Sequence, residues 1–197
     1  MSKAEETKEK IIKQAAQLFN QYGYAGSSMS DIMRATRLQK GGIYNHFQSK
    51  QELALAAFDF ASGTSSKYFV MAIKGKRNAV ERLQAIISVF RNLVNDPPIA
   101  GGCPILNTAI ESDDTNPALR DRTQKAMDAW RNLICRIINL GISKGEIRSN
   151  IEADTVASIM ISTLEGAVMM SKLYGNSIHI ERAIDHLNDY IENSLKI

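Results

Sequence analysis

The chain has 197 residues, of which 44% are hydrophobic and four are proline, so we expect a globular protein with a buried core and not a disordered tail. The formal net charge is +3, and residues 1–50 hold eight Lys/Arg against four Asp/Glu. Cys103 and Cys135 are too few for a disulfide framework, and residues 1–10 lack the apolar run of a signal peptide. These features predict a cytoplasmic protein with no membrane partner.

Helical periodicity begins near the start of the chain. An apolar stripe predicts a first helix that ends at Gly23. Residues 28–37 and 39–47 predict two short helices joined by a tight turn, and Ser49 caps a long helix that extends to about residue 73. This is the layout of a helix-turn-helix, whose second helix enters the DNA major groove. We use the name reader for residues 28–47.

Beyond the reader the pattern also predicts helices, with no strand alternation and no internal repeat. The most apolar stretch, 156–170, is short and interrupted by Glu165, so we expect no membrane span there. Five further helices are expected: one near 80–90 that Asp96-Pro97-Pro98 ends, a short one after Gly101-Gly102, one opened by Asn116-Pro117, one from about Asp154 to Tyr174, and one over 178–195.

The expected fold is therefore all-α, with about nine helices, which is too many for one DNA-binding module. We place a three-helix, helix-turn-helix DNA-binding domain at 1–47 and a helical ligand-binding and dimerisation domain at 48–197. Residues 48–73 would form the helix that connects the two domains.

Within the reader, Ser28 and Asp31 have the spacing of a capping box, which fixes where the first short helix starts. Such a helix N-terminus is also a seat for phosphate, because its backbone N–H groups point outward. In the second helix, Ile43 and Phe47 lie four residues apart and should face inward, which leaves polar side chains on the outside.

Residues 40–53 (KGGIYNHFQSKQEL) resemble the recognition-helix signature of the tetracycline-repressor (TetR) family, and residues 28–32 (SMSDI) resemble the start of that family's first reader helix. The specific match covers about residues 8–55, and the rest matches mainly in helix number and length. The resemblance implies phosphate contacts by Ser28, Lys40, Tyr44, His46 and Lys50, and a groove lined by Gln39, Gly41, Gly42 and Asn45.

Gln39 and Asn45 are the candidates for base recognition, since an amide side chain can bond adenine bidentately. Two alternatives stay open at this stage. Tyr44 could instead pack between helices, and Lys50 could be an ordinary solvated lysine.

The reader departs from the family pattern at two positions. Arg37 stands where the family usually has glycine, which costs on the order of 1 kcal/mol if its backbone is left-handed. Arg37 would offset this cost by reaching a phosphate. Gln39 is a poorer helix cap than the usual serine, and two glycines follow soon after. We therefore expect a loose second helix that becomes ordered on DNA.

The two C-terminal helices carry apolar stripes that either pack on the chain's own core or pair with a second copy. Dimerisation is favoured because readers of this type bind palindromic half-sites in pairs, and the resemblance implies a four-helix interface. The expected interface residues are Val156, Ile159, Ala167, Val168, Ile184, Leu187 and Ile191.

The family resemblance also implies a small-molecule effector pocket in the second domain. Its candidate lining residues, any of which could equally be ordinary core, are Phe60, Phe69, Phe90, Cys103, Met127, Trp130, Met160 and Met169. Glu165 would face either this pocket or the dimer seam.

Gly101-Gly102-Cys103-Pro104, continuing through Asn107 to Glu111, is the second domain's one distinctive motif. Pro104 at a first helical position would make Cys103 the N-cap, where the helix dipole favours a thiolate. This Gly-Cys-Pro segment resembles those of a subset of TetR-like regulators, some of which sense electrophiles or aromatic compounds. The alternative is a half-buried cap beside a glycine hinge. Cys135 lies in an apolar stripe and is expected to be inert.

No catalytic constellation, metal-ligand spacing or cofactor motif is recognisable in the sequence. The preferred function is that of a dimeric repressor, not an enzyme, which binds a pseudo-palindromic double-stranded DNA operator and is released by a small apolar or aromatic effector. The alternatives are an effector-independent architectural DNA-binding protein, a thiol or electrophile sensor acting through Cys103, and a helical enzyme or carrier with no DNA role.

Overall fold

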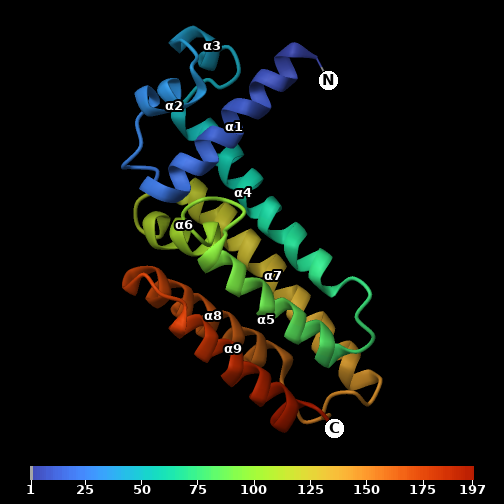
Figure 1. The fold of residues 1–197 in the computed structure, drawn as a ribbon. Coiled ribbons are helices and arrows are strands. Elements are labelled where there is room, and N and C mark those ends of the chain that lie inside the picture. The colour runs from blue at the N-terminus through green and yellow to red at the C-terminus, as the bar shows by residue number, and fades with distance from the viewer. Residues whose placement is uncertain (1) are drawn as a thin grey trace. The chain divides into compact units, whose positions relative to one another are not determined.

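The computed structural model describes residues 2–197, and over this range the chain forms nine α-helices and no strand, which confirms the predicted all-α class (Figure 1). A π-helical turn, Ile191–Leu195, extends the last helix. The helices are α1 (Lys3–Tyr22), α2 (Met29–Thr36), α3 (Lys40–Tyr44), α4 (Lys50–Ile73), α5 (Ala79–Asn95), α6 (Pro104–Ser112), α7 (Pro117–Ser143), α8 (Ala153–Tyr174) and α9 (Ile178–Tyr190).

Most helix boundaries follow the local signals in the sequence. Asn116 accepts a hydrogen bond from the Leu119 N–H at 3.2 Å and so caps α7, as Asn116-Pro117 predicted. Gly175 ends α8 in the left-handed conformation. The exception is α3, which ends at Tyr44, whereas helix was expected over 39–47. Two glycines within its five residues and no side-chain cap account for this short helix.

The chain forms two compact units. Unit 1 consists of residues 2–65 and Pro98–Ala126, and unit 2 consists of Ser66–Pro97 and Met127–Ile197. Helices α4 and α7 each begin in unit 1 and end in unit 2.

The core of unit 1 joins α1 to the reader and to α4. Ile43 and Phe47, the two predicted anchors of the second reader helix, are 0% and 2% exposed, so the inward orientation is confirmed. They belong to one apolar cluster whose other members are Ile11, Ala15, Ala16, Ile32, Leu53, Ala57, Ala61 and Ile99. This packing fixes where the short reader helices lie.

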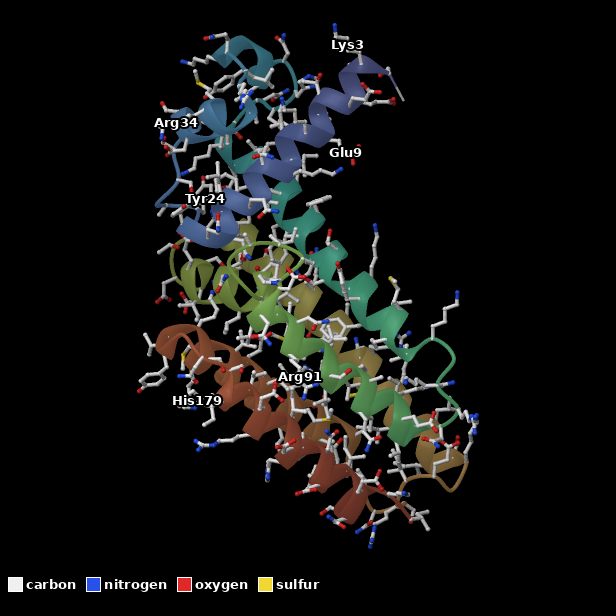
Figure 2. The ribbon with its side chains drawn as sticks, in the orientation of Figure 1. Lys3, Glu9, Tyr24, Arg34, Arg91 and His179 are labelled. Atoms are coloured by element: carbon white, nitrogen blue, oxygen red, sulfur yellow. The ribbon has the colours of Figure 1, made fainter. Side chains whose placement is uncertain are left out.

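In unit 2, α8 and α9 lie side by side and pack on α5 (Figure 1). The ring of Trp130 stacks on those of Phe69 and Phe90, with centroids 5.5 and 5.2 Å away, and the two phenylalanine rings are tilted against each other at 5.7 Å. On the surface, Arg91 of α5 forms an ion pair with Glu181 of α9 at 2.6 Å, and Figure 2 labels Arg91.

Helix α8 is long and apolar enough to cross a membrane if only length and composition are considered. Half of its most apolar window is buried within the protein, as expected for a core helix.

Candidate nucleic-acid interface

The N-terminus of α2 is held by the predicted capping box. Ser28 Oγ accepts a hydrogen bond from the Asp31 N–H at 3.2 Å, and the Asp31 carboxylate accepts from the Ser28 N–H at 2.8 Å. The Ser28 hydroxyl also donates to that carboxylate, and these bonds lower the pKa of Asp31 below its ordinary value. Ser28 itself is exposed, so this helix end is available to an anion.

Arg37 occupies the turn between α2 and α3 in a left-handed conformation, with φ 58° and ψ 31°. It is the one non-glycine residue with positive φ among residues 2–197. Because the backbone of Arg37 is left-handed, a side chain at this position destabilises the turn by on the order of 1 kcal/mol relative to glycine, as predicted from the sequence. The side chain of Arg37 is exposed to solvent.

Helix α3 presents a polar outer face. Gln39 precedes the helix and makes no side-chain capping bond, as expected from its type. A Cβ built on Gly41 would meet nothing within 4 Å, so the fold itself does not require glycine there. Of the predicted DNA contacts, Ser28, Arg37, Gln39, Lys40, Gly41, Tyr44 and Asn45 are exposed, whereas Gly42, His46 and Lys50 are half-buried.

Tyr44 keeps 39% of its surface exposed, and Lys40 Nζ lies 5.6 Å from the centroid of its ring. This distance is within the range of a cation–π contact between residues one helical turn apart. A cation and an aromatic hydroxyl are therefore presented together on the outer face of α3.

Lys50 is placed differently from both sequence-based expectations. Its ammonium donates a hydrogen bond to the Tyr24 carbonyl and lies 4.1 Å from the centroid of the Tyr24 ring. Tyr24, which is labelled in Figure 2, follows the end of α1. Burial lowers the pKa of Lys50, and the nearby Glu111 carboxylate opposes that shift. Lys50 therefore ties α4 to the α1–α2 connection, and a phosphate contact would require it to leave Tyr24.

The predicted pocket residues differ in how deeply they are buried. Phe69, Phe90 and Trp130 fill space by packing against each other, Met160 is fully buried, and Met169 is 49% exposed. A cavity of about 160 Å³ lies instead in unit 1, and none of the eight predicted residues lines it.

This unit 1 cavity lies among α1, α4, α6 and the start of α7. Small alanines leave the space, and sequence reasoning missed them because an alanine stripe has the same pattern as ordinary core. Its lining residues are Ala16, Phe19, Asn20, Tyr24, Ala25, Ala54, Ala57, Phe58, Ala61, Pro104, Thr108, Glu111, Ser112, Thr115, Asn116 and Leu119.

Six of the seven predicted interface residues are at most 7% exposed in the single chain, and only Ile159, at 48%, is on the surface. The other six pack into unit 2 and leave almost no area for a partner. The apolar side chains that α8 and the start of α9 do expose are Ile159, Met169, Met170, Leu173, Tyr174 and Ile178.

Cys103 is the N-cap residue of α6, followed by Pro104, as the motif predicted, and it is 5% exposed. Cys135 is half-buried, and burial raises the pKa of its thiol. Glu165 is 5% exposed on α8. Within residues 2–197, no group of three or more His, Cys, Asp or Glu could hold a metal ion.

Two family descriptions match this chain. Residues 11–57 match "Bacterial regulatory proteins, tetR family", and residues 79–187 match "Tetracyclin repressor-like, C-terminal domain". The chain belongs to the TetR family. It is therefore a transcriptional regulator with an N-terminal DNA-binding helix-turn-helix, and the residues that build the reader lie inside the first match.

Solved and curated TetR-type proteins agree with this assignment. A TetR transcriptional regulator from Chloroflexus aurantiacus J-10-FL is 48% identical, with all of both chains covered and a TM-score of 0.97. A TetR-family regulator from Cytophaga hutchinsonii is 32% identical, covering 100% of this chain and 98% of its own, with a TM-score of 0.90. The HTH-type transcriptional repressor DhaR of Mycobacterium sp. (strain GP1) is 25% identical over 84% of this chain and 82% of its own.

Proposed function

We propose that this regulator is a dimeric repressor that places α3 in the major groove of a pseudo-palindromic operator and leaves it when a small effector binds. The polar outer face of α3, held by the buried anchors Ile43 and Phe47, is the observation that carries the proposal. Gly41 supports it further, because open space beside its Cα lets DNA approach the backbone closely. Repression is the activity named for the relative DhaR.

Within this proposal, residues 1–47 are the DNA-binding domain and 48–197 the ligand-binding and dimerisation domain. Gln39 and Asn45 contact bases. The exposed cations and hydroxyls at Ser28, Arg37, Lys40 and Tyr44 contact phosphates, and the excess positive charge of residues 1–50 draws the reader to DNA. His46 and Lys50 join the phosphate contacts only after the reader adjusts.

Dimerisation follows from geometry and from exposed apolar surface. One short reader helix spans only a few base pairs, so specific binding needs two half-sites. The exposed Met169, Leu173 and Tyr174 on α8, with Ile178 on α9, form a surface that a second copy would cover. Ile159, also on α8, is the one residue of the predicted interface that is exposed, at 48%.

Operator binding is tested by selecting pseudo-palindromic duplexes from random DNA and measuring fluorescence anisotropy between 50 and 200 mM salt. Asn45→Ala is expected to cost about 1–3 kcal/mol and to relax selection at one base pair. Lys40→Ala should weaken all sequences similarly and reduce the salt slope by about 1. The exposed Lys67→Ala is the control and should change neither. Selection of no duplex by the intact protein would refute the proposal.

The oligomeric state is tested by sedimentation at micromolar concentration. The chain should sediment as a dimer, and Leu173→Asp, which puts a charge on a side chain that is 75% exposed, should give a folded monomer. A monomeric intact protein would contradict the dimer.

In the proposed repressor, binding of the effector weakens binding of the operator, with a coupling free energy of about 1–3 kcal/mol.

The open cavity in unit 1 favours the effector-responsive form over an architectural DNA-binding protein, which needs no such space. A thiol sensor acting through Cys103 is disfavoured, because reactive cysteines are partly exposed and this side chain is 5% exposed.

A further inference from the structure

The Gly-Gly-Cys-Pro motif and the helix that follows it hold the end of α1. Asn20 Nδ2 donates to the carbonyls of Ala100 at 2.9 Å and Gly102 at 3.0 Å. Asn107 Nδ2 donates in return to Asn20 O at 3.1 Å and Asn20 Oδ1 at 3.0 Å. The motif therefore serves as a clamp on α1, a role that the sequence pattern alone did not assign.

Glu111, near the end of the same helix, extends the clamp to the reader. Its carboxylate accepts the backbone N–H of Tyr24 at 2.7 Å and that of Ala25 at 2.8 Å. Those two residues lie just before Ser28, which caps α2. Backbone amides bonded to a charged oxygen form strong bonds, so Glu111 sets the path by which the chain enters the reader.

The unit 1 cavity lies against this clamp, because Tyr24, Ala25 and Glu111 all line it. Most of its wall is apolar, with Phe19, Phe58 and several alanines. Its volume of about 160 Å³ is close to that of an engineered apolar cavity of about 150 Å³ that binds benzene.

One polar group in the wall has no partner. The Ser112 hydroxyl is buried, with the residue 1% exposed, and makes no hydrogen bond within the protein. Buried polar atoms are nearly always satisfied, and Ser112 belongs to the cavity wall, so a small rotation of its side chain would offer the unpaired hydroxyl to a ligand there.

We propose that this cavity binds a small, neutral, mainly apolar molecule of single-ring size that carries one hydroxyl. The ligand hydroxyl accepts a hydrogen bond from Ser112 and donates to the Glu111 carboxylate, so it competes with the amides of Tyr24 and Ala25. Losing those amides loosens the entry into the reader and weakens operator binding. The last step rests on the proposed function, whereas binding in the cavity does not.

The charges near the cavity select for a neutral ligand. An anionic ligand would be repelled by the Glu111 carboxylate. A cationic ligand gains little, because the ammonium of Lys50 already interacts electrostatically with that carboxylate. Moving any charged group into an apolar cavity also carries a desolvation cost that a neutral hydroxyl avoids.

Phenol is the probe for the first experiment, with benzene and benzoate for comparison, in an amide chemical-shift titration of the full chain. Phenol and benzene should shift resonances of cavity residues, and benzoate should not. Ser112→Ala is expected to weaken phenol about fivefold and to leave benzene unchanged. Ser65→Ala is the matched control, because Ser65 is also buried without a hydrogen-bond partner but does not line the cavity. Equal phenol affinity in the wild type and Ser112→Ala, or shifts away from the cavity, would overturn the proposal.

The second experiment follows hydrogen exchange of the Tyr24 and Ala25 amides. Saturating phenol should speed their exchange several-fold in the wild type. Glu111→Gln should show fast exchange already without phenol and little further change with it. Slow exchange in that variant, or no effect of phenol on the wild type, would refute the clamp as the link to the reader.

Operator anisotropy separates the two proposals. Phenol binding that accelerates Tyr24 exchange, in a protein that selects no operator, would overturn the repressor function and leave the ligand site standing. Operator binding that phenol does not weaken, despite an occupied cavity, would overturn the coupling alone.

Discussion

Unit 1 and unit 2 each have an apolar core, and they differ in what else joins distant segments beside that core. In unit 1, side chains such as Asn20, Asn107 and Glu111 bond to backbone groups about 80 residues away. The centre of unit 2 is a stack of Phe69, Phe90 and Trp130. A polar ligand can take the place of one hydrogen-bond partner at a small net cost in free energy, because the other partner stays bonded. Separating packed aromatic rings exposes apolar area to water, and no new polar contact offsets that loss. Unit 1 is therefore suited to switching, and unit 2 to remaining rigid.

The largest expected effect tests the apolar side of this comparison. Phe90→Ala removes a fully buried ring from the unit 2 stack and should lower the free energy of unfolding by about 3–5 kcal/mol in guanidinium denaturation. Val70→Ala, at a side chain that is 59% exposed, should change it by less than about 0.5 kcal/mol. A loss below about 1 kcal/mol for Phe90→Ala would mean that the stack does not dominate unit 2.

The next effect tests the clamp in unit 1. Gly101 has φ 106°, and a Cβ there would lie 2.3 Å from the Asn20 carbonyl oxygen. Gly101→Ala should destabilise the protein by about 1–3 kcal/mol and speed exchange of the Tyr24 amide. Gly63→Ala is the control, since its Cβ meets nothing within 4 Å inside α4, and it should stabilise by about 1 kcal/mol. If hydrogen exchange of the Tyr24 amide is unchanged in Gly101→Ala, the turn at Gly101 is not needed for the hydrogen bonds of the clamp.

A smaller effect is expected at the start of the reader. Ser28→Ala removes the side-chain cap of α2 and should cost about 1 kcal/mol of stability, measured by thermal unfolding. Ser30→Ala, at an exposed position inside α2, should cost far less. Similar losses in both variants would argue against the capping box as the device that starts α2.

The same variant has a consequence for pH dependence. Hydrogen bonds from Ser28 hold the pKa of Asp31 below its ordinary value of 3.8. This carboxylate therefore contributes stability above about pH 3.8, and the contribution is lost as pH falls through the lower pKa of the folded state. Ser28→Ala should move the pKa of Asp31 up toward 3.8 in a carbon-detected NMR titration.

The smallest effect on stability is expected at the turn of the reader. Arg37→Gly removes the strain of a left-handed side-chain-bearing residue, but it also raises the conformational entropy of the unfolded chain. The two effects oppose each other, so the variant should be more stable by about 0.5 kcal/mol. If Arg37 contacts a phosphate, the same change should weaken operator binding and reduce the salt slope by about 1. Stronger operator binding by Arg37→Gly would show that this side chain has no role on DNA.

Local signals in the sequence determined the helices, the reader and the family. Ser28 with Asp31, Asn116 with Pro117, and Gly175 each act on backbone groups within a few residues, so their spacing was enough to place helix ends. The inward orientation of Ile43 and Phe47 followed from their four-residue spacing in the same way. Only α3 was shorter than its pattern suggested, because two glycines and a weak cap shorten it.

The tertiary structure alone decided which apolar residues of α8 are buried and where space remains between the helices. Val168 and Met169 are neighbours of similar hydrophobicity, yet one is 0% and the other 49% exposed, because periodicity does not say what packs against each face. The Glu111 clamp joins groups 86 and 87 residues apart, and the alanine-lined cavity forms only when four helices meet. Such features depend on contacts between distant segments, and helical period and capping chemistry carry no information about those contacts.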